Sequence, residues 1–234
     1  MFIVLTTTAF CVVGFKTLDN TALAVDGQSK GNGTLNNHAY VDLGLPSGTM
    51  WATCNIGASK PEGCGYYFAW GESSPKSIYN TKNYKYARSR RLKLTKYCTQ
   101  KDKGYRGFTD NLSTLEPSDD AATVNWGKGW RTPTLDDWSE LFQHTRHEYA
   151  QIGLVRGHRF YGSNGKSIFL PAAGSWQKND EPYNVNTVGG YWSSSVLEED
   201  PTYAGEIYFD MYADAQGRPR WVGLSVRPVC SISN

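Results

Sequence analysis

The sequence is poor in cysteine and histidine, the residues that most often build metal and redox sites. It holds five cysteines and four histidines among 234 residues, and no two cysteines form a CxxC pair. His144 and His147 could share one face of a helix, but no third or fourth ligand follows at a zinc-site spacing. We therefore expect no metal and no cofactor, and we interpret these histidines as satisfied or exposed side chains.

Motifs of nucleophilic catalysis and of phosphate binding are missing as well. Residues 193–195 are serines without a GxSxG turn, and the glycine-rich segments 127–129 and 162–165 lack the pattern of a phosphate loop. The acidic pairs at residues 119–120 and 136–137 fall where a first helical turn stabilises carboxylates. No residue is expected to be catalytic, so an enzyme is the least favoured class of function.

Long apolar runs are scarce. Residues 2–15 form a nearly uncharged apolar run of 14 residues, which is too short to span a bilayer. A small-x-small sequence follows at residues 22–24, so we interpret residues 1–24 as a signal peptide, although its usual basic start is missing. Cys11 leaves a lipid anchor open, and a buried N-terminal strand is the third alternative. No other segment is apolar enough to be a transmembrane helix.

The remaining chain is expected to be a short linker and one domain. Residues 25–37 are rich in Gly, Asn and Ser, which predicts a flexible linker before a single domain at residues 38–234. Export would leave four cysteines, which permit two disulfides in three pairings. A domain of this size does not need disulfides for stability, so we expect free, buried thiols. These four cysteines are Cys54, Cys64, Cys98 and Cys230.

Basic residues gather in one stretch, although the net charge is only +2. Residues 82–106 hold ten basic residues and one acidic residue, interleaved with Tyr84, Tyr86, Tyr97 and Tyr105. This composition is typical of a nucleic-acid surface and also of a solvated loop. Because an exported protein seldom meets nucleic acid, we expect no nucleic-acid partner; an anionic glycan or an acidic protein would suit the stretch better. The surrounding residues, 73–112, are predicted to form a long surface excursion.

Periodicity and turn residues predict an α+β fold with helices in the middle of the chain. Strands are expected over residues 40–45 and 49–55, and a hairpin turn at residues 164–165 (Asn-Gly). One helix is expected over residues 119–126 with Ser118 as its cap. A second begins after Thr134, whose spacing to Asp137 suits a capping box.

The most informative stretch is residues 206–212, where apolar and polar residues alternate as in a half-buried strand. The apolar set, expected in the core, is Ile207, Phe209 and Met211. The opposite face, suited to contact with a ligand, carries Glu206, Tyr208, Asp210 and Tyr212. Residues 213–219 are expected to connect this strand to a return strand that buries Val222, Leu224 and Val226.

Seven motifs in a fixed order resemble the Fibrobacter succinogenes major paralogous domain family over about residues 38–230. They are YVDLGLPSGT at 40–49, WATCN at 51–55, YFAWGE at 67–72, WRTPT at 130–134, LPAAG at 170–174, GYWSS at 190–194 and SVRPV at 225–229. The resemblance implies an exported protein of Bacteroides-like bacteria with a C-type-lectin-like fold. In that fold small twisted antiparallel sheets carry two helices and long loops, and the N- and C-terminal strands pair.

The same resemblance bears on the site. Related formylglycine-generating domains use two C-terminal cysteines, whereas here only Cys230 lies in that region, which argues against oxidase chemistry. In retroelement-diversified relatives, variable residues of the C-terminal hairpin form the ligand surface. The residues in the analogous stretch here are Tyr203, Glu206, Tyr208, Asp210, Tyr212, Asp214, Arg218 and Arg220. Tyr191, Trp192 and Trp221 complete the candidate ligand-binding set, with a place in the core as the alternative for both tryptophans.

Together these observations predict an exported, non-catalytic module that recognises a glycan or a protein at the bacterial surface through the C-terminal hairpin and neighbouring loops. Secretion or attachment to the cell surface is the expected location. A structural or assembly domain of a surface appendage and a retroelement-diversified variable receptor are the alternatives. The sequence does not distinguish a sugar from a protein as the ligand, because tyrosine and tryptophan serve both.

Overall fold

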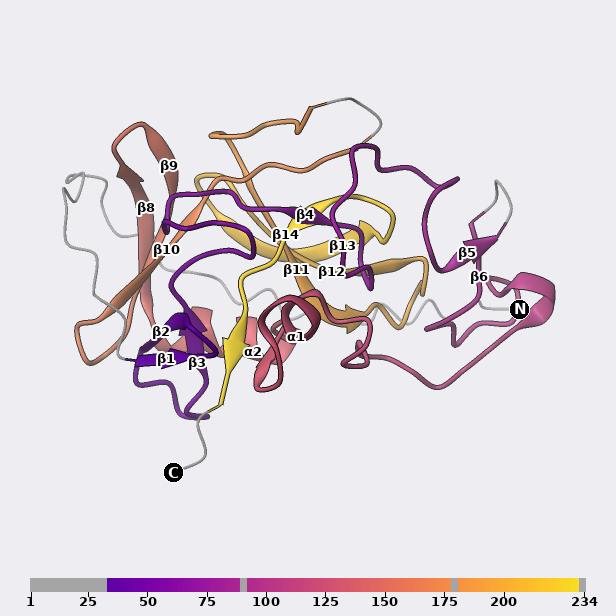
Figure 1. Ribbon diagram of the computed structural model, residues 1–234, viewed down its shortest axis with the longest axis horizontal. Helices are drawn as coiled ribbons and strands as arrows, with labels where there is room; N and C mark the ends of the chain where they lie inside the picture. Colours follow the sequence, from indigo (N-terminus) through magenta and orange to yellow (C-terminus); the bar gives the residue numbers. More distant parts are fainter. Residues whose placement is uncertain (1–32, 89–91, 178–180, 232–234) are drawn as a thin grey trace, which may run out of the picture.

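The chain folds as α+β with its helices in the middle of the chain, as the periodicity predicts (Figure 1). The sheets are small and mostly antiparallel, and the described residues form two α-helices. The computed structural model describes residues 33–88, 92–177 and 181–231. A first sheet has the order β1-β2-β3-β15-β7. Its strands are β1 (Gly33–Leu35), β2 (His38–Asp42), β3 (Met50–Ala52), β15 (Val229–Cys230) and β7 (Trp130–Arg131). Val229 pairs with Trp51, so the C-terminal strand joins the sheet of the first three strands, beside the third of them.

The second five-stranded sheet holds the C-terminal hairpin and has the order β13-β12-β11-β14-β4. Its strands are β4 (Tyr67–Phe68), β11 (Gly189–Val196), β12 (Tyr203–Phe209), β13 (Ala213–Pro219) and β14 (Leu224–Ser225). Strand β14 runs parallel to β11, and the other pairs are antiparallel. Strand β13 lies at the edge of the sheet, which leaves one side of the hairpin without a partner strand.

Two smaller sheets lie at opposite ends of the long axis (Figure 1). One consists of β8 (Arg146–Ile152), β9 (Val155–Tyr161) and β10 (Ser167–Pro171); the other of β5 (Ala87–Arg88) and β6 (Lys93–Leu94). The Asn164-Gly165 turn joins β9 to β10, with Gly165 at φ +78°, so the predicted hairpin is confirmed. A short 3₁₀ turn, η1 (Tyr105–Gly107), follows β6.

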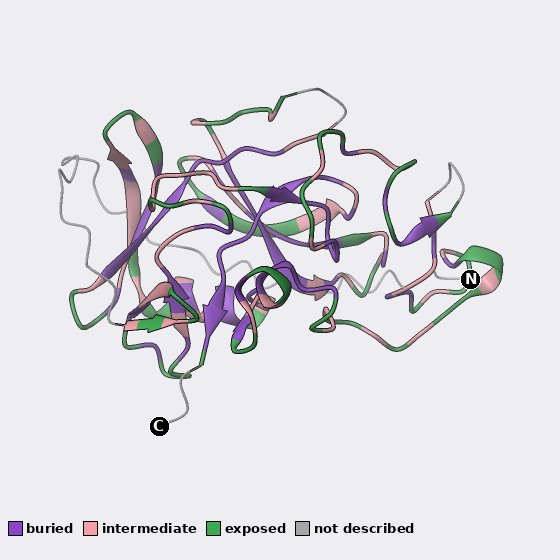
Figure 2. Ribbon diagram, in the orientation of Figure 1, coloured by how far each residue is buried: buried purple, intermediate pink, exposed green. Residues whose placement is uncertain are grey.

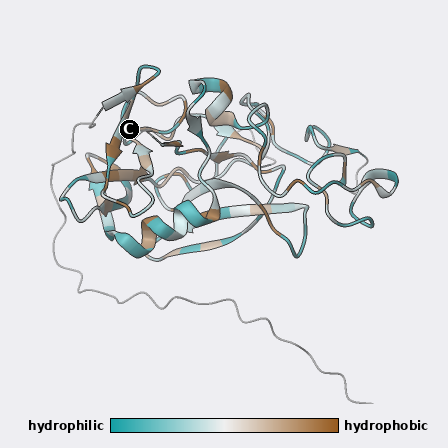
Figure 3. Ribbon diagram, turned by 90° about the horizontal axis from the view of Figure 1, so that it is seen from below, coloured by the Kyte–Doolittle hydropathy of each residue, from teal (hydrophilic) through white to brown (hydrophobic). Residues whose placement is uncertain are grey.

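Helix α2 (Leu135–His144) begins as predicted, because Thr134 and Asp137 form a complete capping box. Its apolar side buries Trp138 and Leu141, while hydrophilic residues lie along the rest of the helix (Figure 3). Helix α1 (Ala121–Trp126) begins later than predicted. Asp120, not Ser118, is its cap, because the Asp120 carboxylate accepts hydrogen bonds from the backbone N–H groups of Ala122 and Thr123.

Two clusters of buried side chains fill the interior, one beside α1 and one between α2 and the β8–β10 sheet. Strands β10, β14 and β15 are buried throughout, whereas the β8–β9 and β12–β13 hairpins carry half-buried and exposed residues (Figure 2). A buried arginine, Arg227, ties the C-terminal segment down by donating to Asn55 Oδ1 and to the carbonyls of Ala52, Thr53 and Phe169. Satisfied donors of this kind make a buried guanidinium tolerable without a carboxylate partner.

The folded domain begins earlier than the predicted boundary at His38. Strand β1 pairs with β2, and the Asn36 side chain donates to the carbonyls of Trp126 and Lys128. Residues 33–37 therefore belong to the domain and not to a linker. The predicted signal peptide and residues 25–32 lie outside the described residues.

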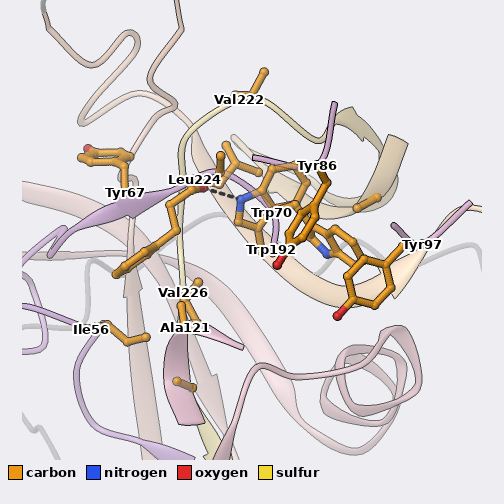
Figure 4. Packing of buried hydrophobic residues seen from close by; sticks show 14 of the residues in the cluster. Ile56, Tyr67, Trp70, Tyr86, Tyr97, Ala121, Trp192, Val222, Leu224 and Val226 are labelled. Carbon is orange, nitrogen blue, oxygen red and sulfur yellow. Dashed lines mark hydrogen bonds between the residues drawn. The ribbon is translucent and has the colours of Figure 1, made fainter. Parts of the chain in front are cut away.

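The predicted surface excursion at residues 73–112 is exposed or half-buried along most of its described length, but several of its tyrosines reach the core. Tyr79, Tyr84, Tyr86 and Tyr97 are all buried, and Tyr86 and Tyr97 pack with Trp70 and Trp192 (Figure 4). Tyr84 and Tyr97 pack against Arg220, which is fully buried and lies 4.5 Å from the Trp70 ring.

Lysines of the excursion fasten it to acidic residues elsewhere in the chain. Lys85 and Lys96 both pair with Asp119, and Lys103 pairs with Asp200 at 2.7 Å. Three of the basic residues that suggested a binding surface therefore hold the excursion against the rest of the domain.

The C-terminal hairpin is shorter than predicted. Strand β12 ends at Phe209, residues 210–212 form the turn, and the return strand is β13. Ile207 and Phe209 are buried as expected, but Met211 is 66% exposed because it lies at the tip of the turn. Val222, Leu224 and Val226 are buried too, in the segment around β14, which pairs with β11 and β4 rather than with β12.

The four described cysteines are free, as expected, although Cys54 and Cys64 are only partly buried. His147 also differs from its predicted place: it lies in β8, where its ring stacks on Phe160. Among the described residues, no helix has both the length and the apolar character needed to cross a bilayer.

Candidate functional site

One face of the second sheet gathers several of the residues that the sequence predicted as ligand contacts. The register pairs Gly190 with Tyr208, and Glu206 with Gln216. Arg218 lies two pairs further along β13, opposite Ala204. Because side chains alternate along each strand, Gly190, Glu206, Tyr208, Gln216 and Arg218 all project to the same side of the sheet.

This face forms the floor of a pocket of about 190 Å³. Residues 174–177 and 183–188 supply the walls. The described lining residues are Gly174, Ser175, Gln177, Tyr183, Asn184, Val188, Gly190, Glu206, Tyr208 and Arg218. The pocket thus joins the C-terminal hairpin to a loop that is some thirty residues distant in the sequence.

The wall segment is held in place by its own backbone. Ser175 and Tyr183 exchange two backbone hydrogen bonds, of 3.0 and 2.7 Å, which close the loop between them. Gly174 adopts φ +66°, and a Cβ atom there would lie 2.2 Å from the Tyr183 carbonyl oxygen. Only glycine allows the chain to fold back this closely.

Gly190 has a comparable role on the floor. A Cβ atom at this position would lie 2.9 Å from Glu206 Oε1 and 3.0 Å from the Gly174 carbonyl oxygen. The missing side chain keeps open the space beside the Glu206 carboxylate. A glycine inside a strand often marks such a close approach.

Glu206 is the central group of the pocket and is 1% exposed. Its Oε2 atom accepts a hydrogen bond of 3.0 Å from Gln216 Nε2 and lies 3.8 Å from Arg218 Nε, which is too far for a hydrogen bond. Burial raises the pKa of Glu206 to about 7, against the opposing effects of Arg218 and Gln216. The carboxyl group therefore exchanges its proton near neutral pH.

Buried carboxylates with structural roles in this protein are far better satisfied. Asp120 accepts from the backbone of Ala122 and from both the backbone and the hydroxyl of Thr132. Asp137 completes the α2 capping box and pairs with Arg131. From the residues that the structure describes, Glu206 receives one hydrogen bond, from the side chain of the exposed Gln216. A buried acid with so little compensation and a shifted pKa, in a pocket, is typical of a functional site.

Arg218 links the floor to the wall. Its Nη2 atom donates to Ser175 Oγ at 3.0 Å, while a quarter of the side chain remains exposed. The pocket therefore presents a carboxylate and a guanidinium side by side. Tyr208 is half-buried at its edge, and Tyr183 is exposed.

Seven of the predicted contact residues lie in the hairpin: four on the pocket face, two in the turn and one on the opposite face. Glu206, Tyr208 and Arg218 line the pocket, and Asp214 lies on the same face, exposed, opposite Tyr208. Asp210 and Tyr212 lie in the exposed turn, and Tyr203 projects from the opposite side of β12.

Three of the predicted contacts are buried in the core, which corrects their assignment as surface residues. Tyr191 donates its hydroxyl proton to the Pro171 carbonyl, and Trp192 donates its indole N–H to the Phe68 carbonyl. Arg220 donates to Tyr84 Oη and to three backbone carbonyls. Each has internal partners for its polar group, and none can reach a ligand. Trp221 is half-buried against the cluster beside α1.

The wall residues were missed by sequence reasoning. Ser175, Gln177, Tyr183 and Asn184 follow the LPAAG motif in a segment without periodicity. The glycines at 174 and 190 were the available signal, because each marks a close backbone approach. Among the described residues, no three His, Cys, Asp or Glu side chains gather as they would around a metal ion.

Comparison with known proteins adds no relative: no family model, no curated protein and no solved structure matches this chain.

Proposed function

We propose that this protein is an exported, non-catalytic ligand-binding module of C-type-lectin-like fold that recognises a glycan or a protein at the bacterial surface. The ligand occupies the pocket between the β12–β13 hairpin and the wall residues at 174–177 and 183–188. The observation that carries the proposal is the buried, poorly compensated Glu206 carboxylate on the floor of that pocket.

The architecture supports the family part of the proposal. Paired terminal strands, two helices and small antiparallel sheets are what the resemblance to the Fibrobacter succinogenes major paralogous domain family implies. The motif LPAAG supplies Gly174 of the pocket wall, and GYWSS supplies Gly190 of its floor. Two of the motifs behind the resemblance therefore also build the site.

Binding suits the pocket better than acid–base catalysis. Among the described lining residues Glu206 is the one carboxylate, and its nearest charged neighbour is Arg218. Hydrolysis by general acid and base generally needs a second titrating group across the substrate. A carboxylate beside a guanidinium, with amides and tyrosines around it, offers hydrogen bonds and ring contacts instead.

Glycan and protein arrays probed with the full chain test the proposal. We expect ligands that bind the natural protein and lose at least about tenfold in affinity with Glu206→Gln, because hydrogen bonds to charged groups contribute about 1.5–3 kcal/mol. Glu199→Gln, the same change in an exposed loop, is the matched control and should bind normally. An array hit that is indifferent to Glu206→Gln but depends on another surface would contradict the proposed site.

An assembly domain of a surface appendage is the alternative that a specific observation favours. Met211, Tyr212 and Leu154 are 66%, 69% and 87% exposed, and β13 is an open sheet edge. Exposed apolar side chains and open edges are common at protein–protein contacts. Sedimentation of the full chain distinguishes the two, because an assembly domain should self-associate through these residues and Met211→Ser with Leu154→Ser should abolish that association.

A further inference from the structure

The charges, size and lining of the pocket indicate which ligand it takes. Resting on the proposed function, we infer that the Glu206 pocket binds one neutral polyhydroxylated ring, a single sugar residue, whose adjacent hydroxyl groups bridge the Glu206 carboxylate and the Arg218 guanidinium. Three features of the pocket support this ligand: the adjacent opposite charges, the volume, and the amide, hydroxyl and tyrosine groups of the wall.

The two charged groups select for a neutral ligand. Glu206 Oε2 and Arg218 Nε lie 3.8 Å apart, so any ligand group that reaches one is close to the other. A ligand ammonium would be attracted by Glu206 but repelled by Arg218, and a ligand carboxylate would meet the reverse. A hydroxyl group donates to a carboxylate and accepts from a guanidinium, and two neighbouring hydroxyls can do both at once.

The volume limits the ligand to one ring. At about 190 Å³ the pocket is smaller than the roughly 300–1,000 Å³ that drug-sized ligands occupy. A longer glycan would place one residue in the pocket and the rest over the exposed residues beside it. Tyr183, which is 56% exposed, and the half-buried Tyr208 offer apolar ring faces at this edge.

The rest of the lining matches hydroxyl groups more closely than an apolar or charged ligand. Ser175, Gln177 and Asn184 contribute one hydroxyl and two amides, which donate and accept hydrogen bonds. The burial of Glu206 adds a further preference. Its pKa lies near 7, so hydroxyl donors that favour the ionised form should bind more tightly as the pH rises through neutrality.

Ligand-observed NMR titration of the full chain tests the inference. The probes are glucose, galactose, mannose and N-acetylglucosamine as neutral rings, with glucosamine and glucuronate as cationic and anionic counterparts of glucose. We expect at least one neutral ring to saturate in the millimolar range or below. The two charged sugars should bind at least about tenfold more weakly than that neutral ring.

Substitutions of pocket residues test whether the sugar binds in this pocket. Glu206→Gln should weaken the neutral sugar at least about tenfold, since hydrogen bonds to a charged group are the stronger kind. Gln177→Ala should weaken it several-fold and, on a half-buried wall residue, serves as a second variant with little risk to folding. Glu199→Gln should leave binding unchanged.

Failure of this inference can be told apart from failure of the proposed function. If a protein on the arrays binds in a Glu206-dependent manner while no neutral sugar does, the function stands and the sugar assignment is wrong. A charged sugar that binds more tightly than every neutral one overturns it as well. If no ligand of any kind depends on Glu206, the proposed function fails together with the inference.

Discussion

The excursion at residues 73–112 and the β12–β13 hairpin look alike in sequence and differ completely in the folded protein. Both are rich in tyrosine and in charge. In the excursion, Tyr84 and Tyr97 are buried against Arg220, and their hydroxyls bond within the protein: Tyr84 donates to the Trp70 carbonyl and Tyr97 to Asp119. In the hairpin Tyr208 is half-buried at a pocket and Tyr212 is 69% exposed.

The difference lies in where the polar partners are, and not in the composition. Lys85, Lys96 and Lys103 each pair with a carboxylate elsewhere in the chain, so three of the ten basic residues at 82–106 stabilise the fold. Among the described residues, Glu206 of the hairpin has a single hydrogen bond and an arginine 3.8 Å away. A surface rich in tyrosine and charge therefore indicates binding only after its internal partners have been accounted for.

Arg218 and Arg220 lie two residues apart in the sequence, one at the pocket and one in the core. Their substitutions should differ most in stability. Arg220→Ala should lower the free energy of unfolding by at least about 4 kcal/mol, because it leaves a cavity and the carbonyls of Lys96, Tyr97 and Pro201 without their donor. Arg218→Ala should cost about 1 kcal/mol or less, since its side chain is a quarter exposed. Equal losses in the free energy of unfolding, measured with urea, would contradict the distinction between a core arginine and a pocket arginine.

Substitutions of core and surface residues within the hairpin should give the next largest difference in the free energy of unfolding. Phe209→Ala should cost about 3–4 kcal/mol, because Phe209 is buried and its ring lies 4.8 Å from that of His158 and 5.8 Å from that of Tyr191. Met211→Ala and Tyr212→Ala should each stay within about 0.5 kcal/mol, as expected for exposed positions. A Met211 variant as damaging as Phe209→Ala would mean that β12 extends through the turn.

The contributions of Glu206 and Asp119 to the free energy of unfolding should depend on pH in opposite directions. The Glu206 pKa is raised from 4.5 to about 7, so between these values the folded state holds a proton that the unfolded state has released. The stability contributed by that proton is lost as the pH rises through the window, by about 3 kcal/mol. Relative to wild type, Glu206→Gln should therefore gain about that amount between pH 4.5 and pH 8.

Asp119 of the contrasting network supplies the control. Burial raises its pKa, but hydrogen bonds from Lys96, Tyr97 and Lys85 outweigh this and hold it well below 3.8. Its contribution is present above the unfolded pKa and is lost only as the pH falls through lower values. Asp119→Asn should thus be destabilised by a constant amount from pH 5 to pH 8. A Glu206→Gln difference that is equally flat would mean that its carboxyl is already ionised throughout.

The smallest expected effect is the change in ligand affinity when two exposed cations of the excursion are removed. Arg88 and Lys101 are exposed and, unlike Lys85, Lys96 and Lys103, have no ion pair among the described residues. Replacing both with alanine should change affinity for the ligand found on the arrays by less than about twofold. A tenfold loss in the same titration would move the site to the excursion.

Local rules predicted the elements whose determinants are adjacent in sequence. The Thr134–Asp137 capping box and the Asn164-Gly165 turn lie where the pattern predicts them, because each is fixed within a few residues. Burial of Ile207 and Phe209 followed from strand alternation. Met211 did not, because the chain turns after Phe209, where Asp210 Oδ1 accepts from the Tyr212 N–H.

The errors concern residues whose environment comes from distant segments. Arg220 is buried because carbonyls more than a hundred residues away in the sequence receive its N–H groups, which no local pattern encodes. The same holds for the pocket: Glu206, Tyr208 and Arg218 could be chosen from the hairpin alone, whereas Ser175, Gln177, Tyr183 and Asn184 join them only through the fold.

Hydrogen exchange of the full chain, with and without the strongest ligand from the arrays, shows whether the ligand binds at the hairpin or at the excursion. We expect slower exchange in the described wall residues, 174–177 and 183–190, and in the hairpin, 203–219, with no change in the excursion at residues 82–88 and 92–106. Slower exchange confined to the excursion, with the hairpin and wall unchanged, would contradict it and assign recognition to the basic, tyrosine-rich segment instead.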